Sequence, residues 1–514
     1  MFRIRAFGDK GEEKLNRKKK LLLNTVTGIA KQIVTVICGF ILPRFILLYY
    51  GSEINGLISS ISHFLSFISL LDLGVGSVIQ ANLYKPLADK DIYKVSAIVV
   101  SSQRFFRRLA YIFLVYIVIL AVALPNTVSV EQDFLFTSSL VMIIAISTFA
   151  QFFFGMTNEL LLAADQRSYI TISMQIGTVL LNTLCCIILM EIGASIHAVK
   201  LLTSAIYVLR PIGQSLYVKY NYQIDKHVVT KGEVIKQKWN GLSQHFAAIV
   251  CENIDVVLLS IFSSLGDVSV YSVYYMVTSG VTMIIMTAST GIESLFGNMI
   301  ARKENIALSK TFSVIEWGIH VLVTVVFSTA AVLIVPFISI YTKGITDINY
   351  IAPIFGAMLV VAYAVRCLRI PYFVIIKAAG HFKQTQNGAF ISAILNIVLS
   401  VALIFKFGLV GIAFGTFVAM FYHTCYFVWY LQNNILNRGA KQFVLYILSD
   451  LLCCGIIAVA TSSFKLINST YISWIMMAIK TGLISVVVTG SVNAILYREQ
   501  LQAAIRFLKS KGRE

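Results

Sequence analysis

The feature that most constrains this chain is a series of uninterrupted apolar segments, each about twenty residues long or longer. A hydrocarbon core about 30 Å thick takes about 20 apolar residues per helix, and only helices or closed barrels satisfy their backbone hydrogen bonds there. The segments are continuous rather than alternating in polarity, so they predict helices and not barrel strands. The chain is 58% hydrophobic with a mean hydropathy of +0.81, which excludes a soluble globular class.

We therefore expect an all-α polytopic membrane protein with about fourteen transmembrane helices. The expected helices cover residues 21–49, 56–83, 97–124, 134–163, 168–190, 194–218, 241–264, 267–299, 311–341, 349–377, 384–405, 409–431, 441–463 and 473–497. A long polar stretch after the sixth helix divides the chain. The predicted parts are a basic cytoplasmic leader (1–20), an N-terminal lobe (21–218), a cytoplasmic linker (219–239), a C-terminal lobe (240–432), helices 13 and 14 (433–497) and a cytoplasmic amphipathic tail (498–514).

An internal repeat relates the two lobes. Residues 163–182 and 378–396 share a double Ala, a short polar turn and a late Asn, and residues 74–83 resemble 291–300. The separations, 215 and 217 residues, agree. Six spans per lobe is an even number, so both copies have the same orientation. That predicts a pseudo-twofold axis along the membrane normal, with the substrate path between the lobes.

The charge distribution predicts the orientation. A net charge of +18 would suggest a nucleic-acid partner in a soluble protein. Here the predicted inner segments carry 29 Lys and Arg and the outer loops only three. By the positive-inside rule both termini are cytoplasmic, and we expect membrane lipids rather than nucleic acid as partners.

Three stretches carry a family resemblance: LLDLGVGSVIQANLYKPLADKD (70–91), CENIDVVLLSIFSSLGDVSVYSVYYMV (251–277) and GIESLFGNMIARKEN (291–305). They resemble bacterial polysaccharide flippases of the MOP exporter superfamily, the O-antigen and capsule repeat-unit exporters, over nearly all of the chain. The resemblance implies translocation of an undecaprenyl-pyrophosphate-linked oligosaccharide from the inner to the outer leaflet of the bacterial cytoplasmic membrane. Drug exporters and lipid II flippases share this fold, so the fold alone does not choose the substrate.

Charged residues inside the spans are candidates for the substrate path, because each costs about 2.5–3.5 kcal/mol at the bilayer centre. The expected cationic, substrate-binding cavity comprises Lys31, Arg366, Arg369, Arg210 and Arg44. Guanidinium groups bind phosphate oxygens in pairs and would suit a pyrophosphate. The alternative is that Arg44 and Arg210 extend to lipid headgroups.

Three further arginines precede the apolar part of the third helix: Arg104, Arg107 and Arg108. We expect them to contact headgroups, the alternative being that they receive the lipid-linked phosphate.

The acidic candidates for ion coupling are Asp72, Glu252 and Asp255, the last two on one helix face. A carboxylate in apolar surroundings can carry a proton or hold Na⁺. The alternative is a static ion pair with Arg366 or Lys31. No cofactor is expected beyond such an H⁺ or Na⁺, and no group of His and acids has metal-site spacing.

The predicted function is transport, not enzymatic catalysis. A membrane polysaccharide polymerase or ligase typically carries its catalytic groups on a long external loop, whereas the outer loops here are short. A cation-coupled antiporter of the same fold is the second alternative. We expect a monomeric flippase, with a polysaccharide polymerase or other assembly protein as partner.

Overall fold

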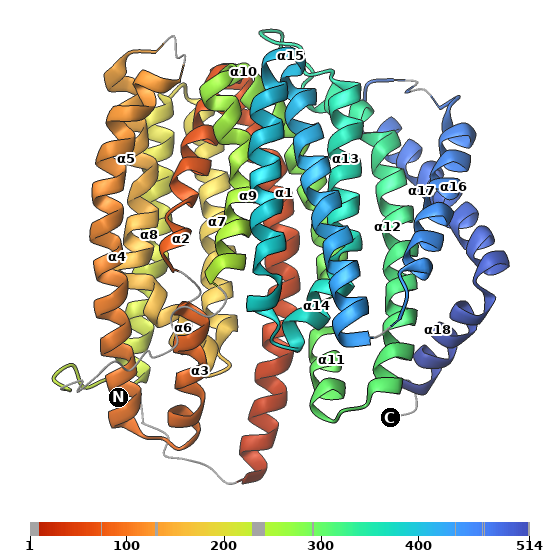
Figure 1. Ribbon diagram of the computed structural model, residues 1–514. Coiled ribbons are helices and arrows are strands. Elements are labelled where there is room, and N and C mark those ends of the chain that lie inside the picture. Colours follow the sequence, from red (N-terminus) through yellow and green to blue (C-terminus); the bar gives the residue numbers. More distant parts are fainter. Residues whose placement is uncertain are drawn as a thin grey trace. The chain divides into compact units, whose positions relative to one another are not determined.

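The structure is a computed structural model that describes residues 10–72, 75–128, 132–228, 242–289, 292–436, 438–464, 466 and 468–511. Gly74, Gly291, most of the predicted linker and the ends of the leader and tail lie outside the described residues. Within these ranges the regular structure is entirely helical (Figure 1). The predicted all-α class is confirmed.

Most helices follow one another with short connections; the longest interval, between Asn221 and Leu242, lies mostly outside the described residues. Their bounds are α1 (Lys10–Ser66), α2 (Ser69–Asp72), α3 (Val75–Ala88), α4 (Ile92–Thr127), α5 (Phe134–Ala150), the π-helical η1 (Gln151–Gly155), α6 (Met156–Ala164), α7 (Ser168–Glu191), α8 (Ile196–Asn221), α9 (Leu242–Phe262), α10 (Leu265–Ser289), α11 (Ile292–Ala301), α12 (Asn305–Tyr341), α13 (Pro353–Leu368), α14 (Ile370–Ala378), α15 (Phe382–Leu431), the π-helical η2 (Gln432–Leu436), α16 (Lys441–Thr461), α17 (Tyr471–Leu496) and α18 (Arg498–Lys511).

In the described ranges, each of the fourteen predicted segments overlaps one or more helices. In the described ranges, ten helices are long and apolar enough to cross a membrane. Two of them join two predicted segments each: α1 contains a non-helical residue at Gly51 and α15 one at Gly408. The predicted sixth and seventh segments correspond to α8 and α9, which are 26 and 21 residues long. The multi-pass membrane fold is thereby confirmed.

The helices pack into two compact units: unit 1 is Met1–Tyr50 with Phe64–Leu242, and unit 2 is Gly51–His63 with Ser243–Glu514. Within unit 1, α5 packs against both α4 and α8 (Figure 1). Within unit 2, α12 packs against α13, α16 and α17.

The units differ from the predicted lobes at residues 51–63, which pack with unit 2. The reason is a row of small polar side chains. Ser52 donates from its backbone N and its hydroxyl to the Asp347 carboxylate, at 2.6 and 2.8 Å, and the Ser60 and Ser260 hydroxyls lie 2.7 Å apart. Hydropathy marks this stretch as apolar but does not say which helices it packs against.

The internal repeat reappears in the backbone. Positive φ angles follow equivalent helices at Lys90 and Lys303 (both 57°), at Gln166 and Gly380 (58° and 73°), and at Gly193 and Gly408 (76° and 52°). The members of these pairs are 213, 214 and 215 residues apart, which matches the spacing of the sequence repeat. Left-handed residues after a helix satisfy its last carbonyl groups, and outside glycine they are uncommon. Their recurrence at one spacing supports the two-copy prediction.

Large apolar side chains cover much of the exposed helix surface. Val115, Ile119 and Val122 on α4 are 54–61% exposed, and Leu483 and Val487 on α17 are 62–63% exposed. Water would make such continuous apolar faces unstable, whereas lipid chains solvate them.

Candidate functional site

A buried carboxylate forms the centre of the candidate site in unit 2. Asp255 of α9 is 3% exposed. It accepts hydrogen bonds from the Tyr271 hydroxyl of α10 at 2.9 Å, from Asn396 Nδ2 at 3.2 Å and from Thr416 Oγ1 at 2.6 Å. Asn396 and Thr416 lie on the two halves of α15, before and after Gly408. The kink in α15 therefore brings two helical segments to one carboxylate.

The partners of Asp255 are all neutral, and no Lys, Arg or His in the described ranges forms an ion pair with it. Ser400 adds another oxygen, donating to Asn396 Oδ1 at 3.1 Å. A buried carboxylate without a protein cation favours uptake of a proton or a cation, because desolvation of an isolated charge is costly. We call Asp255, Tyr271, Asn396, Ser400 and Thr416 the Asp255 site.

The neighbouring acid on α9 has a different environment. Glu252 forms an ion pair with Arg366 in the last turn of α13. The Glu252 side chain is 43% exposed and that of Arg366 is 19% exposed. The Arg366 guanidinium also lies over the Tyr363 ring, 5.8 Å from its centroid. This is the arginine pairing that the sequence leaves open as the alternative to a coupling role for Glu252, and it distinguishes Glu252 from Asp255.

Arg369 lies at the break between α13 and α14. Its guanidinium lies over the Phe427 ring at 5.8 Å, and its buried Nη1 has no hydrogen-bond partner among the described residues. Buried unpaired N–H groups are rare and call for an acceptor such as water or an anion. Arg366 and Arg369 are three residues apart but contact different groups.

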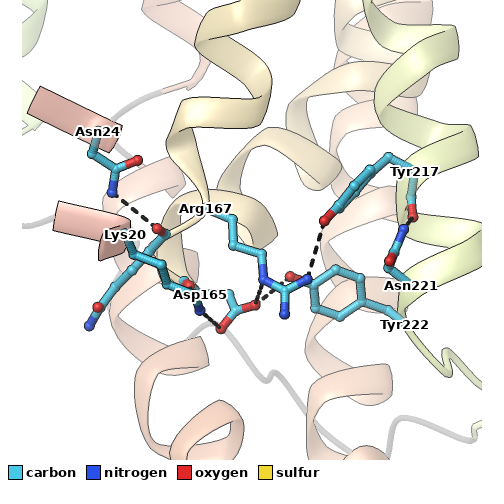
Figure 2. A network of polar contacts seen from close by, with 8 residues as sticks. Lys20, Asn24, Asp165, Arg167, Tyr217, Asn221 and Tyr222 are labelled. Atoms are coloured by element: carbon cyan, nitrogen blue, oxygen red, sulfur yellow. Dashed lines mark hydrogen bonds and ion pairs between the residues drawn. The ribbon is translucent and has the colours of Figure 1, made fainter. Parts of the chain in front are cut away.

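A second polar cluster, which we call the Asp165 hub, lies in unit 1 at the end predicted to be cytoplasmic (Figure 2). Asp165 follows α6, and its carboxylate accepts from Arg167 Nε at 2.8 Å and from the Tyr222 hydroxyl at 2.6 Å. Lys20 of α1 donates to the Asp165 backbone carbonyl at 3.0 Å and lies 3.4 Å from its carboxylate. One acid thus joins α1, the turn before α7 and the end of α8.

Electrostatic interactions and a helix cap stabilise the Asp165 hub. Burial, and then the Asp165 carboxylate, raise the pKa of the Tyr222 hydroxyl, which therefore stays protonated and donates. Burial lowers the pKa of Arg167, but the neighbouring Asp165 carboxylate opposes this effect and the net pKa is raised. Asn24 of α1 donates to the Gln166 carbonyl at 3.0 Å and accepts from the Tyr169 amide at 2.7 Å, which caps the first turn of α7.

Comparisons with known proteins address the fold. No protein-family model matches the sequence, and no curated protein matches it. Among solved structures, the lipid II flippase MurJ in an inward closed conformation covers 93% of this chain and 100% of its own, with a TM-score of 0.70 and 13% identity. An inward-facing multidrug resistance MATE transporter of the MOP superfamily matches with a TM-score of 0.62 and 12% identity, and it covers 77% of this chain and 93% of its own. The chain has the MOP-superfamily fold.

A eukaryotic MATE transporter, AtDTX14, is also similar: its TM-score is 0.53 at 14% identity, and it covers 84% of this chain and 99% of its own. At 12–14% identity the similarity establishes the MOP fold and carries over no individual residue. The three structures are of transporters or flippases.

Within the MOP fold, the predicted cations divide between the units. Lys31 lies on α1 in unit 1 and is exposed. Arg366 and Arg369 belong to unit 2, so the convergence of these three residues stays a prediction. Arg210 of α8 donates from Nη2 to Thr178 Oγ1 at 3.2 Å, and its buried Nε has no partner in the described part of the chain. Arg44 is partly buried on α1.

The predicted headgroup residues lie on the first half of α4, where Arg104, Arg107 and Arg108 are exposed. Arg107 lies 5.3 Å from the centroid of the Phe153 ring. At 1.5 Å per residue the 36 residues of α4 extend about 54 Å, well beyond a core of about 30 Å. The first turns of α4, which carry these arginines, can therefore lie outside the hydrocarbon core, in the headgroup region. Asp72 ends α2, and its side chain lies outside the described residues.

Sequence reasoning missed most partners in both clusters. The conserved spacing of the repeat did single out one of them, since Asn396 is the late Asn of the second copy. Nothing in the sequence links Tyr271 or Thr416 to Asp255, because the contact depends on how α10 and α15 pack. Asp165 lies in the repeated polar turn, but two of its partners, Lys20 and Tyr222, are 145 and 57 residues away in the sequence.

Proposed function

We propose that this protein is a flippase that moves undecaprenyl-pyrophosphate-linked oligosaccharide repeat units from the inner to the outer leaflet by alternating access, for cell-surface polysaccharide biosynthesis. The observation that carries the proposal is the extent of the structural similarity. A lipid flippase covers 93% of this chain, whereas the MATE transporters cover 77% and 84%. More of the chain therefore has a counterpart in a protein that handles a lipid substrate.

The chemistry of the buried cations supports the same substrate class. Arg369 and Arg210 each keep a buried guanidinium nitrogen without a partner in the described ranges. A diphosphate offers acceptor oxygens in pairs, which suit guanidinium groups. In the proposal, these arginines with Lys31, Arg366 and Arg44 bind the pyrophosphate, and Arg104, Arg107 and Arg108 contact it or the headgroups at the inner leaflet.

The test measures lipid-linked repeat units in a deletion strain. Wild type is compared with a Lys31→Ala/Arg366→Ala/Arg369→Ala variant and with a Lys480→Ala control, an exposed lysine on α17, at matched membrane levels. The proposal expects accumulation on the inner leaflet that wild type and the control clear and the triple variant does not. Equal clearance by all three would disprove the assigned binding residues. No accumulation in the deletion strain would disprove the substrate.

We further propose that the Asp255 site binds the coupling ion, a proton or Na⁺. One carboxylate among neutral oxygens matches a single positive charge, whereas Glu252 is already paired with Arg366. Transport by an Asp255→Asn variant should then lose its dependence on the ion gradient, while Glu252→Gln keeps it. An unchanged gradient dependence in Asp255→Asn would refute this role.

The Asp255 site is also the observation that favours the second candidate, a cation-coupled drug antiporter of the same fold. Drug sensitivity in the deletion strain without accumulated repeat units would select it. In either case we expect a monomer in the bacterial cytoplasmic membrane with both termini inside, and a polysaccharide polymerase as partner for the flippase.

A further inference from the structure

Two ion pairs in unit 2 keep their charged groups partly exposed, although both connect helices of an apolar bundle. The first is the pair of Glu252 and Arg366. In the second, Lys377 of α14 donates from Nζ to Glu293 Oε2 of α11 at 3.0 Å. The side chains of Lys377 and Glu293 are 43% and 46% exposed. The proposed function leaves this second pair without a role.

The second pair lies close to the end of the bundle predicted to be cytoplasmic. Its two helices, α11 and α14, pack against each other (Figure 1). Lys377 lies in the last turn of α14, and Glu293 lies in the first turn of α11. The turn after α14, at Gly380, is one of the repeated turns on the predicted inner side. A lysine beside such a turn lies near the inner headgroups under the positive-inside rule.

The exposure of this pair makes it easy to separate. Exposed ion pairs contribute little to stability, because water solvates both charges when they part. Unit 2 also contains a buried pair, Arg438 with Glu316, whose side chains are 18% and 0% exposed, and opening it would leave an uncompensated buried charge. When Glu293 leaves Lys377 it remains in the first turn of α11, where the helix dipole favours a negative charge. An incoming anion can therefore replace the carboxylate on Lys377 at little cost.

An exposed aromatic ring lies on the same face of α14 as Lys377. Phe373 precedes Lys377 by one helical turn and is 39% exposed. Its ring is stacked on that of Phe427 of α15, with centroids 6.1 Å apart and an interplanar angle of 2°. A ligand at Lys377 thus meets a positive charge and an apolar surface within one turn of helix. A diphosphate joined to an apolar chain has the two complementary parts.

We propose that Lys377, Glu293 and Phe373 form an entry site for a lipid-linked diphosphate at the inner end of unit 2. Glu293 holds Lys377 in position until the diphosphate displaces the carboxylate, and Phe373 contacts the chain next to the diphosphate. The proposal rests on the proposed function for the class of ligand. Arg366 lies eleven residues earlier along α13 and α14, roughly 16 Å away by helical rise, so the entry site precedes it on the way inward.

The test measures how well a probe protects lysine amines from reductive methylation, with mass spectrometry as the readout. The sample is the purified full-length protein in nanodiscs of zwitterionic lipid, and the probe is farnesyl diphosphate. The probe should protect Lys377 but not Lys94, an exposed lysine paired with Asp91 at 2.9 Å, which is the internal control. This first measurement uses the wild type, so it stands even if a variant does not fold.

The sign of one substitution separates exchange from a purely structural pair. Glu293→Gln removes the competing carboxylate, so it should lower the probe concentration that half-protects Lys377 by up to about fivefold, the competition that an exposed ion pair exerts. Glu304→Gln, which removes the same charge just before α12, should leave this concentration unchanged.

Inorganic pyrophosphate distinguishes a lipid-linked diphosphate from a free one. Phe373→Ala should raise the half-protecting concentration of farnesyl diphosphate severalfold and leave that of pyrophosphate unchanged, because only the former has an apolar chain. Equal effects of Phe373→Ala on both probes would overturn the assignment of a lipid ligand.

Protection of Lys377 no greater than that of Lys94 would overturn the proposal. A higher half-protecting concentration in Glu293→Gln than in wild type would also overturn it, because the carboxylate would then support the site instead of competing for it. An equal fall in Glu304→Gln would reduce the effect to general charge and refute the exchange. These measurements do not depend on transport, so accumulation of repeat units in the deletion strain tests the proposed function separately.

Discussion

The Asp165 hub makes a quantitative prediction about the stability of unit 1. The substitution Asp165→Asn removes the negative charge that Lys20, Arg167 and Tyr222 share while keeping the size of the side chain. The side chains of Lys20, Asp165 and Arg167 are 20–31% exposed. Their ion pairs thus fall between exposed pairs, worth up to about 1 kcal/mol, and buried pairs, whose disruption costs about 3–5 kcal/mol.

The expected loss follows from three contacts. Two partly exposed ion pairs contribute about 1 kcal/mol each. The Tyr222 hydrogen bond to a charged acceptor contributes about 1.5 kcal/mol, part of which an amide oxygen retains. Lys20 keeps its bond to the backbone carbonyl of residue 165. The sum is a destabilisation of about 2–3 kcal/mol, which for a cooperative unit of about 200 residues lowers the midpoint by about 5–10 °C.

The assay is thermal unfolding of the purified protein, with Asp133→Asn as the matched control. Asp133 precedes α5, is exposed and makes no side-chain cap hydrogen bond. A double-mutant cycle with Tyr222→Phe should give a coupling energy of about 1 kcal/mol. High salt should reduce the difference in thermal midpoint between wild type and Asp165→Asn, because the ion pairs are only partly buried. If Asp165→Asn and Asp133→Asn unfold within a degree of each other, the charge-hub reasoning is wrong.

Three further substitutions, one of them with a matched control, test the packing. Gly408→Ala, at φ 52° and ψ −129°, should destabilise by about 1–3 kcal/mol, because few residues other than glycine adopt this conformation. The matched control Gly177→Ala, in a regular helix with open space around it, should stabilise slightly. Equal thermal midpoints would contradict the glycine-dependent kink. Gly56→Ala would place a Cβ 1.9 Å from the Leu265 carbonyl oxygen, so folded protein recovered from membranes should fall sharply; a normal yield would mean that this close approach is wrong. Trp317→Phe removes the indole N–H from Asn493 and should cost about 1–2 kcal/mol in thermal unfolding; a change confined to experimental error would show that α12 and α17 do not depend on this bond.

The sequence predicts the helices well because lipid imposes a strong pattern on every span. It predicts the repeat because the turns around Gln166 and Gly380 need the same unusual backbone. It does not predict the contact between His320 and Asp450, which are 130 residues apart in the sequence. That contact depends on how α16 packs against α12. Arg366 and Arg369 are exceptional in an apolar span, and Pro371 at the start of α14 indicates a helix break beside them. Their different partners depend on how the neighbouring helices pack, which the sequence does not show.

The assignment of residues 51–63 to unit 2 has a consequence for dissecting the chain into fragments. A cut in the polar stretch after α8 would leave this segment on the N-terminal fragment, with the hydrogen-bond partners of Ser52 and Ser60 on the other. The C-terminal fragment alone would lack a helix that completes its interior. Co-expressed fragments should therefore associate, because residues 51–63 of the N-terminal fragment pack into the C-terminal fragment. This segment is equivalent to the exchanged element of a domain-swapped protein. We therefore expect the two halves of this chain to be separable as sequence repeats but not to fold independently of each other.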